Sequence, residues 1–534
     1  MKLYTKDYLR FKILDNGVCV KEFEGVELAS KGLPGDEVSI DGSLVKRTEH
    51  PPLVGVIHLQ SKIKYGMTTR GYPIYLFEPL NKAYPLMIVG SSEKGATTNM
   101  LGLAKFESWT DKYPRANLTR IIGPCGNHAV EAESLLLRYS PWSYPKVFEI
   151  SPRYSEALTS RPLCKGFTFN IDPPGCEDVD DVFTVEMLNS DTYMLTISIT
   201  DVAIAIEEGT TLDLYAKKVG QSLYPPDTKP KHMLPPSLGT KELSLGVDQI
   251  RNCISLSIRY SHVKGVLETS WSLAKVAVDK AYTYKEAQYE SRPEFQILKS
   301  IVNAIAGKPI TTSEEWVETL MIYYNKEAGK LLKTYGTGIL RSHSAPDQEK
   351  LLQWVSIDPN LEKLAYSSAT YCSPDTDTKH WGLGLTDYTH ASSPLRRYAD
   401  LYNQRCLIEI LEGINVNKRT TNELCNELNL LGKAAKAFER DTFFLQALST
   451  KGSAQGLEGR VLEIQEEKQA IQLWVPTWNR LIRVKCAILN GSVIPKDGGQ
   501  AFPITVAQVI CLKYHIQYQN ARWKDKIIFS ITPI

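Results

Sequence analysis

The sequence predicts a multidomain α+β protein, with two small β-barrels first, a large α+β domain in the centre and a third β-barrel at the end. A chain of 534 residues exceeds one ordinary domain, since most domains span about 100–200 residues. Short apolar runs between turn residues fill residues 1–125 and return over residues 449–534, as is typical of small barrels. Between them, strand-like patterns before Glu290 give way to helix-like patterns.

Composition and charge exclude several classes of protein. Hydrophobic residues make up 43% and charged residues 23% of the chain, which excludes a disordered chain, a collagen and a simple coiled coil. Because 62 Lys and Arg nearly balance 60 Asp and Glu, nucleic-acid binding would need local basic patches or metal ions. The ten cysteines form no CxxC and the histidines no HxxxH, so we expect reduced thiols and no zinc site.

No segment predicts a membrane association. The first residues alternate charged and apolar side chains, unlike a signal peptide, and runs such as Val202–Ile206 are far shorter than the ~20 apolar residues of a membrane span. We therefore expect an intracellular, soluble, cytoplasmic protein that is a monomer and does not bind membranes.

Turn and strand signals divide the start of the chain into two barrels and a connector. Strands are expected at Val38–Ile40 and Leu53–Leu59, which places one barrel at residues 1–55 and a second at residues 56–125. A Gly-Pro-Asn turn then precedes an apolar helical pattern, so residues 126–160 are expected to form a helical connector.

Helix signals are clearest in the second half of the central domain, residues 161–448. Thr312 and Glu315 fit a capping box ahead of an apolar stripe. A second helix is expected to start at Ser393, with a proline in its first position, and to end before Gly413.

Four aspartates close together form the strongest local signal in the chain: Asp172, Asp178, Asp180 and Asp181, in "NIDPPGCEDVDDV". A strand at Val182–Leu188 and its hairpin partner are expected to follow, so the acids should gather at one end of a hairpin. Crowded carboxylates repel one another unless protons or cations neutralise them. Oxygen ligands favour Mg²⁺ or Mn²⁺, and a pair of such ions can drive a phosphoryl displacement.

A solvated acidic turn is the alternative interpretation of such a run. An EF-hand does not fit, since the loop lacks glycine at its sixth position and glutamate at its twelfth. The valine-rich strand that follows favours an ordered metal site over a surface loop.

Arg396 and Arg397 lie at the expected start of the second helix. A cation is unfavourable at the positive end of a helix dipole, so an anion held by both arginines and by free N–H groups would resolve the conflict, and phosphate fits. The alternative is a pair between Arg396 and Asp400, worth roughly 0.2–0.5 kcal/mol. Beside the acids, the arginines point to phosphodiester chemistry.

Four segments together make the chain resemble the ribonuclease II / ribonuclease R (RNB) family of 3′→5′ exoribonucleases. In chain order they are "NIDPPGCEDVDDV", "SLYPPDTKPKHMLPPSLGTKELSL", "ILRSHSAPDQEKL" and "HWGLGLTDYTHASSPLRRYADL". The resemblance covers nearly the whole chain. It implies two cold-shock (OB-like) barrels, shorter than is usual and with no endonuclease domain before them, then an RNB catalytic domain and an S1-like barrel.

The resemblance also implies roles for the matching residues. The Mg²⁺ ligands, with Mn²⁺ as a substitute, would be Asp172, Asp178, Asp180 and Asp181, of which the last two are the least dispensable for catalysis. Arg396 would hold the scissile phosphate of the RNA, with Arg397 beside it. Tyr224 would clamp the 3′-terminal nucleotides, and the pair that senses the terminal ribose 2′-hydroxyl would be Tyr284 and Glu318.

The chain departs from the family pattern in a few places. Gln404 stands where the family has histidine, and Ala391 and Ser392 replace a Phe-Thr pair. The segment between Tyr284 and Glu318 is shorter than in the family, whose additional hairpin carries an aromatic residue that stacks on the terminal base. Because such stacking is worth ~1–3 kcal/mol per base, we expect a weaker grip on the RNA end but intact chemistry.

The function expected is Mg²⁺-dependent hydrolysis of single-stranded RNA from its 3′ end to nucleoside 5′-monophosphates. An RNA-binding protein of the same fold that has lost catalysis is the alternative. It would require a broken acid cluster or a missing Arg396, and the sequence has neither. A DNA-directed nuclease is the third hypothesis.

Overall fold

The computed structural model describes residues 1–15, 17–24, 31–93, 97–226, 228–414, 420–449, 456–494, 500–517 and 526–533, so Asp227 of the "SLYPPD" segment lies outside it. The chain forms two compact units. The first consists of Met1–Pro141, Ala345–Ser367 and Lys436–Ile534, and the second of Trp142–Ser344 and Ser368–Ala435.

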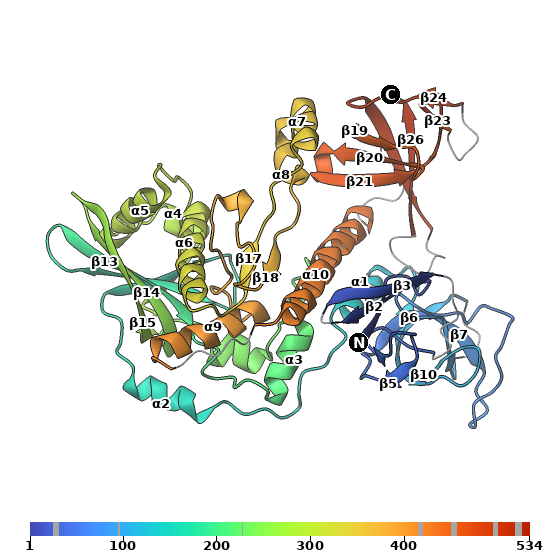
Figure 1. The fold of residues 1–534 in the computed structure, drawn as a ribbon, viewed down its shortest axis with the longest axis horizontal. Helices are drawn as coiled ribbons and strands as arrows, with labels where there is room; N and C mark the ends of the chain where they lie inside the picture. Colours follow the sequence, from blue (N-terminus) through green and yellow to red (C-terminus); the bar gives the residue numbers. More distant parts are fainter. Residues whose placement is uncertain are drawn as a thin grey trace. The chain divides into compact units, whose positions relative to one another are not determined.

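Two β-domains open the first unit (Figure 1). The first is a sheet of order β3-β2-β1-β4-β5, and the second is a closed barrel of order β10-β8-β7-β6-β9. Each has its own apolar core, around Phe11 and Ile13 in the sheet and around Phe77 and Met87 in the barrel. The elements are β1 (Lys2–Thr5), β2 (Arg10–Asp15), β3 (Val18–Glu24), β4 (Glu37–Val38), β5 (Leu44–Lys46), β6 (Leu53–Ile57), β7 (Ile74–Pro79), β8 (Met87–Gly90), β9 (Met100–Ser108), β10 (Arg115–Pro124) and the helix α1 (His128–Tyr139).

The C-terminal part of the first unit is a sheet of order β21-β20-β19-β25-β26 beside a small sheet of order β22-β23-β24. Trp354 and Leu361 pack against Leu462 and Trp474 of this sheet, although their segment was expected in the central domain. The elements are α7 (Gln348–Ile357), η2 (Pro359–Leu361), α8 (Glu362–Ala365), β19 (Leu457–Gln465), β20 (Ala470–Val475), η4 (Pro476–Trp478), β21 (Arg480–Lys485), β22 (Ala487–Leu489), β23 (Ser492–Ile494), β24 (Phe502–Pro503), β25 (Val509–Ile516) and β26 (Ile527–Pro533).

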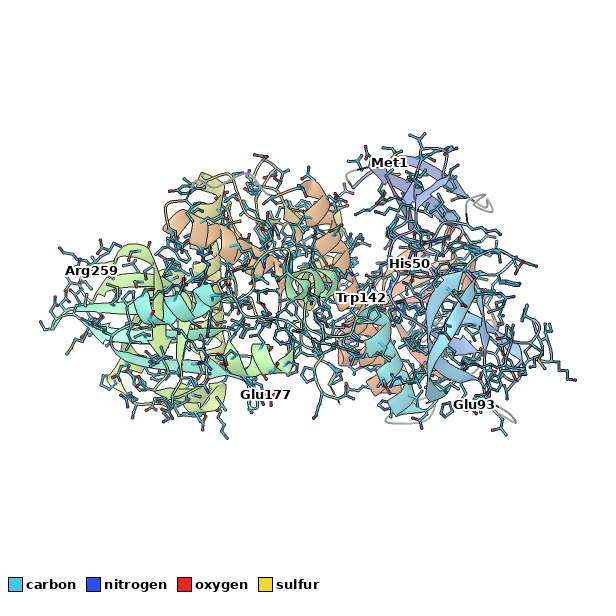
Figure 2. The ribbon with its side chains drawn as sticks, turned by 90° about the horizontal axis from the view of Figure 1, so that it is seen from below. Met1, His50, Glu93, Trp142, Glu177 and Arg259 are labelled. Carbon is cyan, nitrogen blue, oxygen red and sulfur yellow. The ribbon has the colours of Figure 1, made fainter. Side chains whose placement is uncertain are left out.

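A six-stranded sheet of order β15-β14-β13-β12-β11-β16 forms the centre of the second unit. Asp181 pairs with Ile199 across β12 and β13, so the predicted hairpin is confirmed and the acids lie at its open end. Figure 2 shows Glu177, in the acidic loop, far along the sheet from Arg259 near the hairpin turns. The strands are β11 (Phe167–Asp172), β12 (Asp181–Met187), β13 (Thr192–Thr200), β14 (Ile250–Ser261), β15 (Gly265–Ala277) and β16 (Lys280–Thr283), with β17 (Leu340–Ser342) and β18 (Thr370–Cys372) as a separate pair.

Helices pack on this sheet and enclose its core. Phe295 of α5 stacks on Phe169 of β11 with ring centroids 4.5 Å apart. The predicted capping box of α6 is confirmed, since Thr312 accepts from the backbone of Glu315 and the Glu315 side chain accepts from the backbone of Thr312. The helices are α2 (Pro152–Ser160), α3 (Thr211–Val219), η1 (Ser237–Glu242), α4 (Tyr284–Gln288), α5 (Pro293–Ala306), α6 (Ser313–Thr334), η3 (Trp381–Leu383), α9 (Tyr398–Leu411) and α10 (Asn422–Ser449). None of the helices described has the length and hydropathy needed to cross a bilayer.

The predicted start of the second helix is wrong. The helix α9 begins at Tyr398, and Ser393 instead begins a turn whose carbonyl accepts from Arg397 N at 3.0 Å. The Ser393 N–H donates to Asp400 Oδ1 at 2.8 Å. A turn held by this side-chain contact therefore replaces the expected helix cap. The predicted end is confirmed, since α9 stops at Leu411 and Gly413 follows with a φ of 70°.

Gly329, within α6, lies against the loop that carries Tyr388. A Cβ at Gly329 would be 2.2 Å from the carbonyl oxygen of Asp387. Glycine within a helix lowers its stability by about 1 kcal/mol relative to alanine. The close approach of the loop therefore explains glycine at this position.

We expect Gly329→Ala to lower the free energy of unfolding by about 1–3 kcal/mol, because the new methyl group would displace the backbone of Asp387. Gly432→Ala in α10 is the matched control, since nothing lies within 4 Å of its Cβ, and it should raise the stability by up to about 1 kcal/mol. Denaturant unfolding measures both changes. Similar effects of the two substitutions would contradict the packing argument.

Candidate active site

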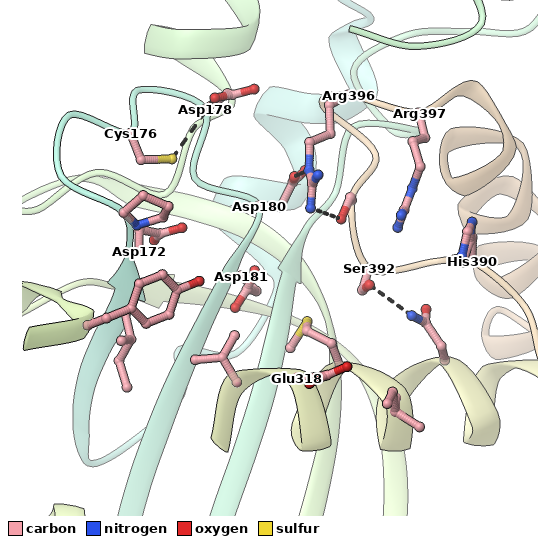
Figure 3. Close-up of a pocket in the computed structure, with 18 of the residues that line it drawn as sticks. Asp172, Cys176, Asp178, Asp180, Asp181, Glu318, His390, Ser392, Arg396 and Arg397 are labelled. Carbon is pink, nitrogen blue, oxygen red and sulfur yellow. Dashed lines mark hydrogen bonds and ion pairs between the residues drawn. The ribbon is translucent and has the colours of Figure 1, made fainter. Parts of the chain in front are cut away.

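One cavity of about 610 Å³ in the second unit is lined by all nine residues that the sequence singled out. Its wall is formed by the ends of β11 and β12, the segment around Tyr224, the helices α4 and α6, and the loop before α9 (Figure 3). The nine residues are Asp172, Asp178, Asp180, Asp181, Tyr224, Tyr284, Glu318, Arg396 and Arg397.

Asp180 is the most tightly held of the four acids. Its Oδ1 accepts from Leu395 N at 2.9 Å, and its Oδ2 accepts from Arg396 Nε at 3.1 Å. Burial raises the pKa of Asp180 to about 7, although Arg396 and the Leu395 N–H oppose the rise. The carboxylate thereby joins β12 to the turn before α9.

Asp172 and Asp181 carry charge that the protein compensates poorly. Asn170 Nδ2 donates to Asp172 Oδ2 at 2.9 Å, whereas the Asp181 carboxylate has no hydrogen bond or ion pair within the described chain. Burial raises the pKa of Asp172, and burial together with repulsion from Asp172 and Asp180 raises that of Asp181 well above its usual value.

Asp178 is held by a different set of partners. Tyr224 Oη donates to Asp178 Oδ2, and His232 Nδ1 lies 3.5 Å from the same oxygen. Burial alone would raise the pKa of Asp178, but the bonds to His232 and Tyr224 outweigh it and lower that pKa. Sequence reasoning did not single out His232, whose contact with Asp178 is visible only in the fold.

The two arginines differ in their partners. Arg397 forms a bidentate pair with Asp400, with Nε–Oδ2 and Nη2–Oδ1 distances of 2.7 Å each. The Arg396 side chain is 47% exposed, bonded to Asp180 and, through Nη2, to Ser393 Oγ at 3.0 Å. The alternative pair of Arg396 with Asp400 is therefore wrong. The expected phosphate cradle of free helix N–H groups is also wrong, because the backbone N–H groups of residues 395–398 already donate to protein oxygens.

Tyr284 and Glu318 lie on α4 and α6, at the side of the cavity formed by these helices. Burial and then the charges of Asp172 and Asp181 raise the pKa of Tyr284 to about 12, so its hydroxyl is protonated at neutral pH. The whole segment between Tyr284 and Glu318 is described and contains α5 but no strand, in agreement with its short length.

Two asparagines that sequence reasoning missed hold the loop of the cavity in place. Asn325 Oδ1 accepts from Ala391 N at 2.8 Å, and its Nδ2 donates to Ser392 Oγ at 3.0 Å. Asn403 Nδ2 donates to the carbonyl oxygen of His390 at 2.9 Å. A signal existed for Asn325, which is a buried polar residue within the apolar stripe of α6.

The acids fit a hard cation by their chemistry. Carboxylate oxygens are the ligands of Mg²⁺, and the raised pKa values of Asp172 and Asp181 reflect charge that a cation would neutralise. Among the described residues, no three Asp, Glu, His or Cys side chains converge closely enough to hold a metal ion alone. Oxygen ligands from water or a substrate phosphate would have to complete the shell, as is usual for Mg²⁺.

Two family models match the chain. The RNB domain matches residues 161–294 and 355–413, and the Dis3-like cold-shock domain 2 matches residues 74–140. The RNB match contains eight of the nine site residues, and Glu318 lies in the gap between its two segments.

Named relatives are similar over much of the chain. The exosome complex exonuclease RRP44 homolog A of Arabidopsis thaliana is 25% identical over 62% of this chain and 45% of its own length. Ribonuclease R of Helicobacter pylori (strain ATCC 700392 / 26695) is 25% identical over 55% of this chain and 57% of its own length. The chain spans about half the length of the curated relatives it matches.

Solved structures share the fold. The apo form of Mycoplasma genitalium RNase R superposes with a TM-score of 0.72 at 14% identity, covering 97% of this chain and 98% of its own. Yeast Ssd1, described as a pseudonuclease, superposes with a TM-score of 0.62 at 16% identity, covering 92% of this chain and 71% of its own. At these identities the likeness concerns the fold alone.

Replacing Asp181 by asparagine should stabilise the metal-free protein, because it removes a half-buried carboxylate that has no side-chain partner among the described residues. We expect a gain of at least about 1 kcal/mol at pH 8. A carboxyl group whose pKa is raised on folding loses stability as the pH rises from its unfolded-state pKa toward its folded-state pKa, so the gain should shrink toward pH 5.

Urea unfolding in EDTA across this pH range measures the gain. Glu186→Gln, on β12 but outside the cavity, is the control and should show no such trend. A gain that is absent, or equal at every pH, would contradict the assignment of an uncompensated charge to Asp181.

Proposed function

Because the chain belongs to the RNB family, with a Dis3-like cold-shock domain ahead of its RNB domain, we propose that it hydrolyses single-stranded RNA from the 3′ end to nucleoside 5′-monophosphates. One observation carries the proposal: four aspartates and the half-exposed Arg396 line the same cavity. Cations held by carboxylates, opposite a guanidinium group, are what the cleavage of a phosphodiester requires.

Arg396 is the residue that binds the scissile phosphate. Its Nε and Nη2 are used by Asp180 and Ser393, while Nη1 has no hydrogen-bond partner within the described residues. The guanidinium group is thus fixed along one edge and can offer the other to a phosphate oxygen. The charge of Arg397 is paired with Asp400 through a bidentate contact, so we assign Arg397 to the positive potential of the cavity and Arg396 to the phosphate.

The four aspartates would hold Mg²⁺, or Mn²⁺ in its place. When bound, such an ion neutralises the carboxylates and lowers the pKa of a coordinated water. Asp181 and Asp172 are the most available ligands, since neither is held by a cationic side chain. Asp180 orients Arg396, and Asp178 orients Tyr224.

Tyr224, Tyr284 and Glu318 bind the 3′-terminal nucleotides. Tyr224 is 45% exposed and fixed through its hydroxyl, so its ring can stack on a base. Tyr284 keeps its proton and Glu318 is an acceptor, which together suit a ribose 2′-hydroxyl that both accepts and donates.

The β-domains of the first unit would bind the RNA upstream of its 3′ end, through charge and stacking. Structures of Mycoplasma genitalium RNase R, which shares the fold, contain ribose-methylated single-stranded RNA and double-stranded RNA. We extend single-stranded RNA binding to this chain as part of the proposal.

An RNA-binding protein without catalysis is the second candidate. The observation that favours it is the structural likeness to Ssd1, a pseudonuclease. Against it, all four aspartates and Arg396 are present and line one cavity. A third candidate, a DNA-directed nuclease, would not need the tyrosine and glutamate pair.

The central test is the digestion of an unstructured RNA labelled on its 3′-terminal nucleotide. We expect the wild-type protein with Mg²⁺ to release labelled nucleoside 5′-monophosphate first, and Asp181→Asn to slow this release by at least about 10²-fold while RNA binding persists. Glu186→Gln should match the wild type. Unchanged turnover in Asp181→Asn would refute the site, and binding without any digestion by the wild type would favour the second candidate.

Tyr284→Phe and Glu318→Ala should reduce the preference for RNA over DNA of the same sequence by about tenfold each, since each loses one bond to the 2′-hydroxyl. The ratio of kcat/KM for the two substrates measures this preference. Substitution of either residue should leave DNA turnover nearly unchanged. An equal loss on RNA and DNA would show that these residues do not read the 2′-hydroxyl.

A further inference from the structure

His390 lines the active-site cavity, and no role has yet been given to it. Figure 3 shows it on the opposite side of Arg396 from Asp172. Burial and then the guanidinium groups of Arg397, Arg341 and Arg396 lower the pKa of His390 well below its usual value. The imidazole is therefore neutral and carries one N–H, and the positive charges around it make this end of the cavity attractive to an anion.

The Tyr371 hydroxyl determines which nitrogen of His390 carries the proton. Tyr371 Oη lies 3.0 Å from His390 Nδ1. Burial raises the pKa of Tyr371, so this hydroxyl has a proton to donate. Its neighbours Arg341 and Arg397 cannot accept that proton, and the Asp400 carboxylate is already bonded to Arg397. His390 Nδ1 is thus the acceptor, and the hydrogen of the imidazole is on Nε2.

This Nε2–H has no partner in the described part of the protein. A histidine with a purely structural role in the core would bond protein groups through both ring nitrogens. His390 Nε2 has no hydrogen bond among the described residues, and it is not one of the polar atoms that are fully buried without a partner. Because His390 lines the cavity and its Nδ1 is bonded to Tyr371, we infer that the free N–H faces the cavity.

The ring of His390 is held in place before any ligand arrives. Asn403 bonds the carbonyl oxygen of His390, and the rings of Tyr371 and Tyr388 contact the imidazole edge-on, with centroids 5.7 and 6.0 Å away. The backbone of Tyr371 is clamped in turn by the Asn429 side chain, at 2.7 and 2.9 Å. A donor fixed in this way binds without a large loss of side-chain freedom.

We propose that His390 Nε2–H, together with the charge of Arg396, binds the phosphodiester that is second from the 3′ end of the substrate. The inference rests on the proposed function, which places the terminal linkage between the acids and Arg396. The terminal nucleotide ends in a free 3′-hydroxyl and carries the scissile phosphate on its 5′ side. The next phosphate of the RNA therefore lies one nucleotide further toward the 5′ end. Tyr371 is a positioning residue, which fixes the tautomer of His390.

The test measures binding, so that it does not depend on turnover. The Asp181→Asn protein is titrated with RNA oligonucleotides in which one linkage at a time is an uncharged methylphosphonate. We expect about tenfold weaker binding when the second linkage from the 3′ end is replaced. This penalty should fall to the level found at the other upstream linkages when His390→Ala is added, because the N–H donor is gone and only the charge of Arg396 remains.

Further variants separate this role from a structural one. His390→Gln, which offers an N–H near the position of Nε2, should retain most of the penalty, and Tyr371→Phe should reduce it. His262→Ala, an exposed histidine after β14, is the control and should keep the full penalty. A merely structural role for His390 would shift the melting temperature and weaken binding of every oligonucleotide alike.

Each outcome has one meaning. A penalty at the second linkage that persists in His390→Ala, or one that is equal at all linkages, overturns the proposal. If the Asp181→Asn protein binds no RNA, both the proposal and the proposed function are wrong. If the linkage pattern is found but the wild type releases no monophosphate, His390 binds as proposed and the hydrolytic function alone fails.

Discussion

The bonds between Asp180 and the turn before α9 are the interaction on which the site depends. Leu395 N and Arg396 Nε bind the two oxygens of one buried carboxylate, although the residues lie 215 and 216 positions apart in the chain. Burial of a charge is costly unless it is paired and hydrogen-bonded. These bonds offset part of that cost and, at the same time, set Arg396 at the open end of the acidic hairpin.

Around this contact, several charged side chains of the site are bonded to another side chain of the protein. Arg397 is neutralised by Asp400, and Asp178 is bonded to Tyr224. Asp181 and one edge of Arg396 have no partner within the described residues. The cavity thus presents two carboxylates without a cationic partner, Asp172 and Asp181, beside the free edge of Arg396, which is the complement of a phosphodiester with its cations.

Local patterns in the sequence predicted the local structure well. The capping box of α6 and the β12–β13 hairpin are formed by residues close in the chain, so their signals were sufficient. The start of α9 was missed because Ser393 and the proline after it resemble a helix cap, whereas Asp180 and Asp400, contacts invisible to local patterns, hold them in a turn. The nine residues that the resemblance singled out line one cavity, but the resemblance could not show that Arg396 and Arg397 have separate partners.

We propose above all that the cavity holds the last linkage of an RNA strand between metal-bound carboxylates and Arg396. A crystal structure of the Asp181→Asn protein with Mn²⁺ and a short RNA tests it most directly, through the anomalous signal of the metal. We expect a Mn²⁺ peak beside Asp172 and the 3′-terminal phosphodiester within hydrogen-bonding distance of the Arg396 guanidinium group. A strand bound with its 5′ end in the cavity, or one that leaves Arg396 bonded to Asp180 alone, would contradict the claim.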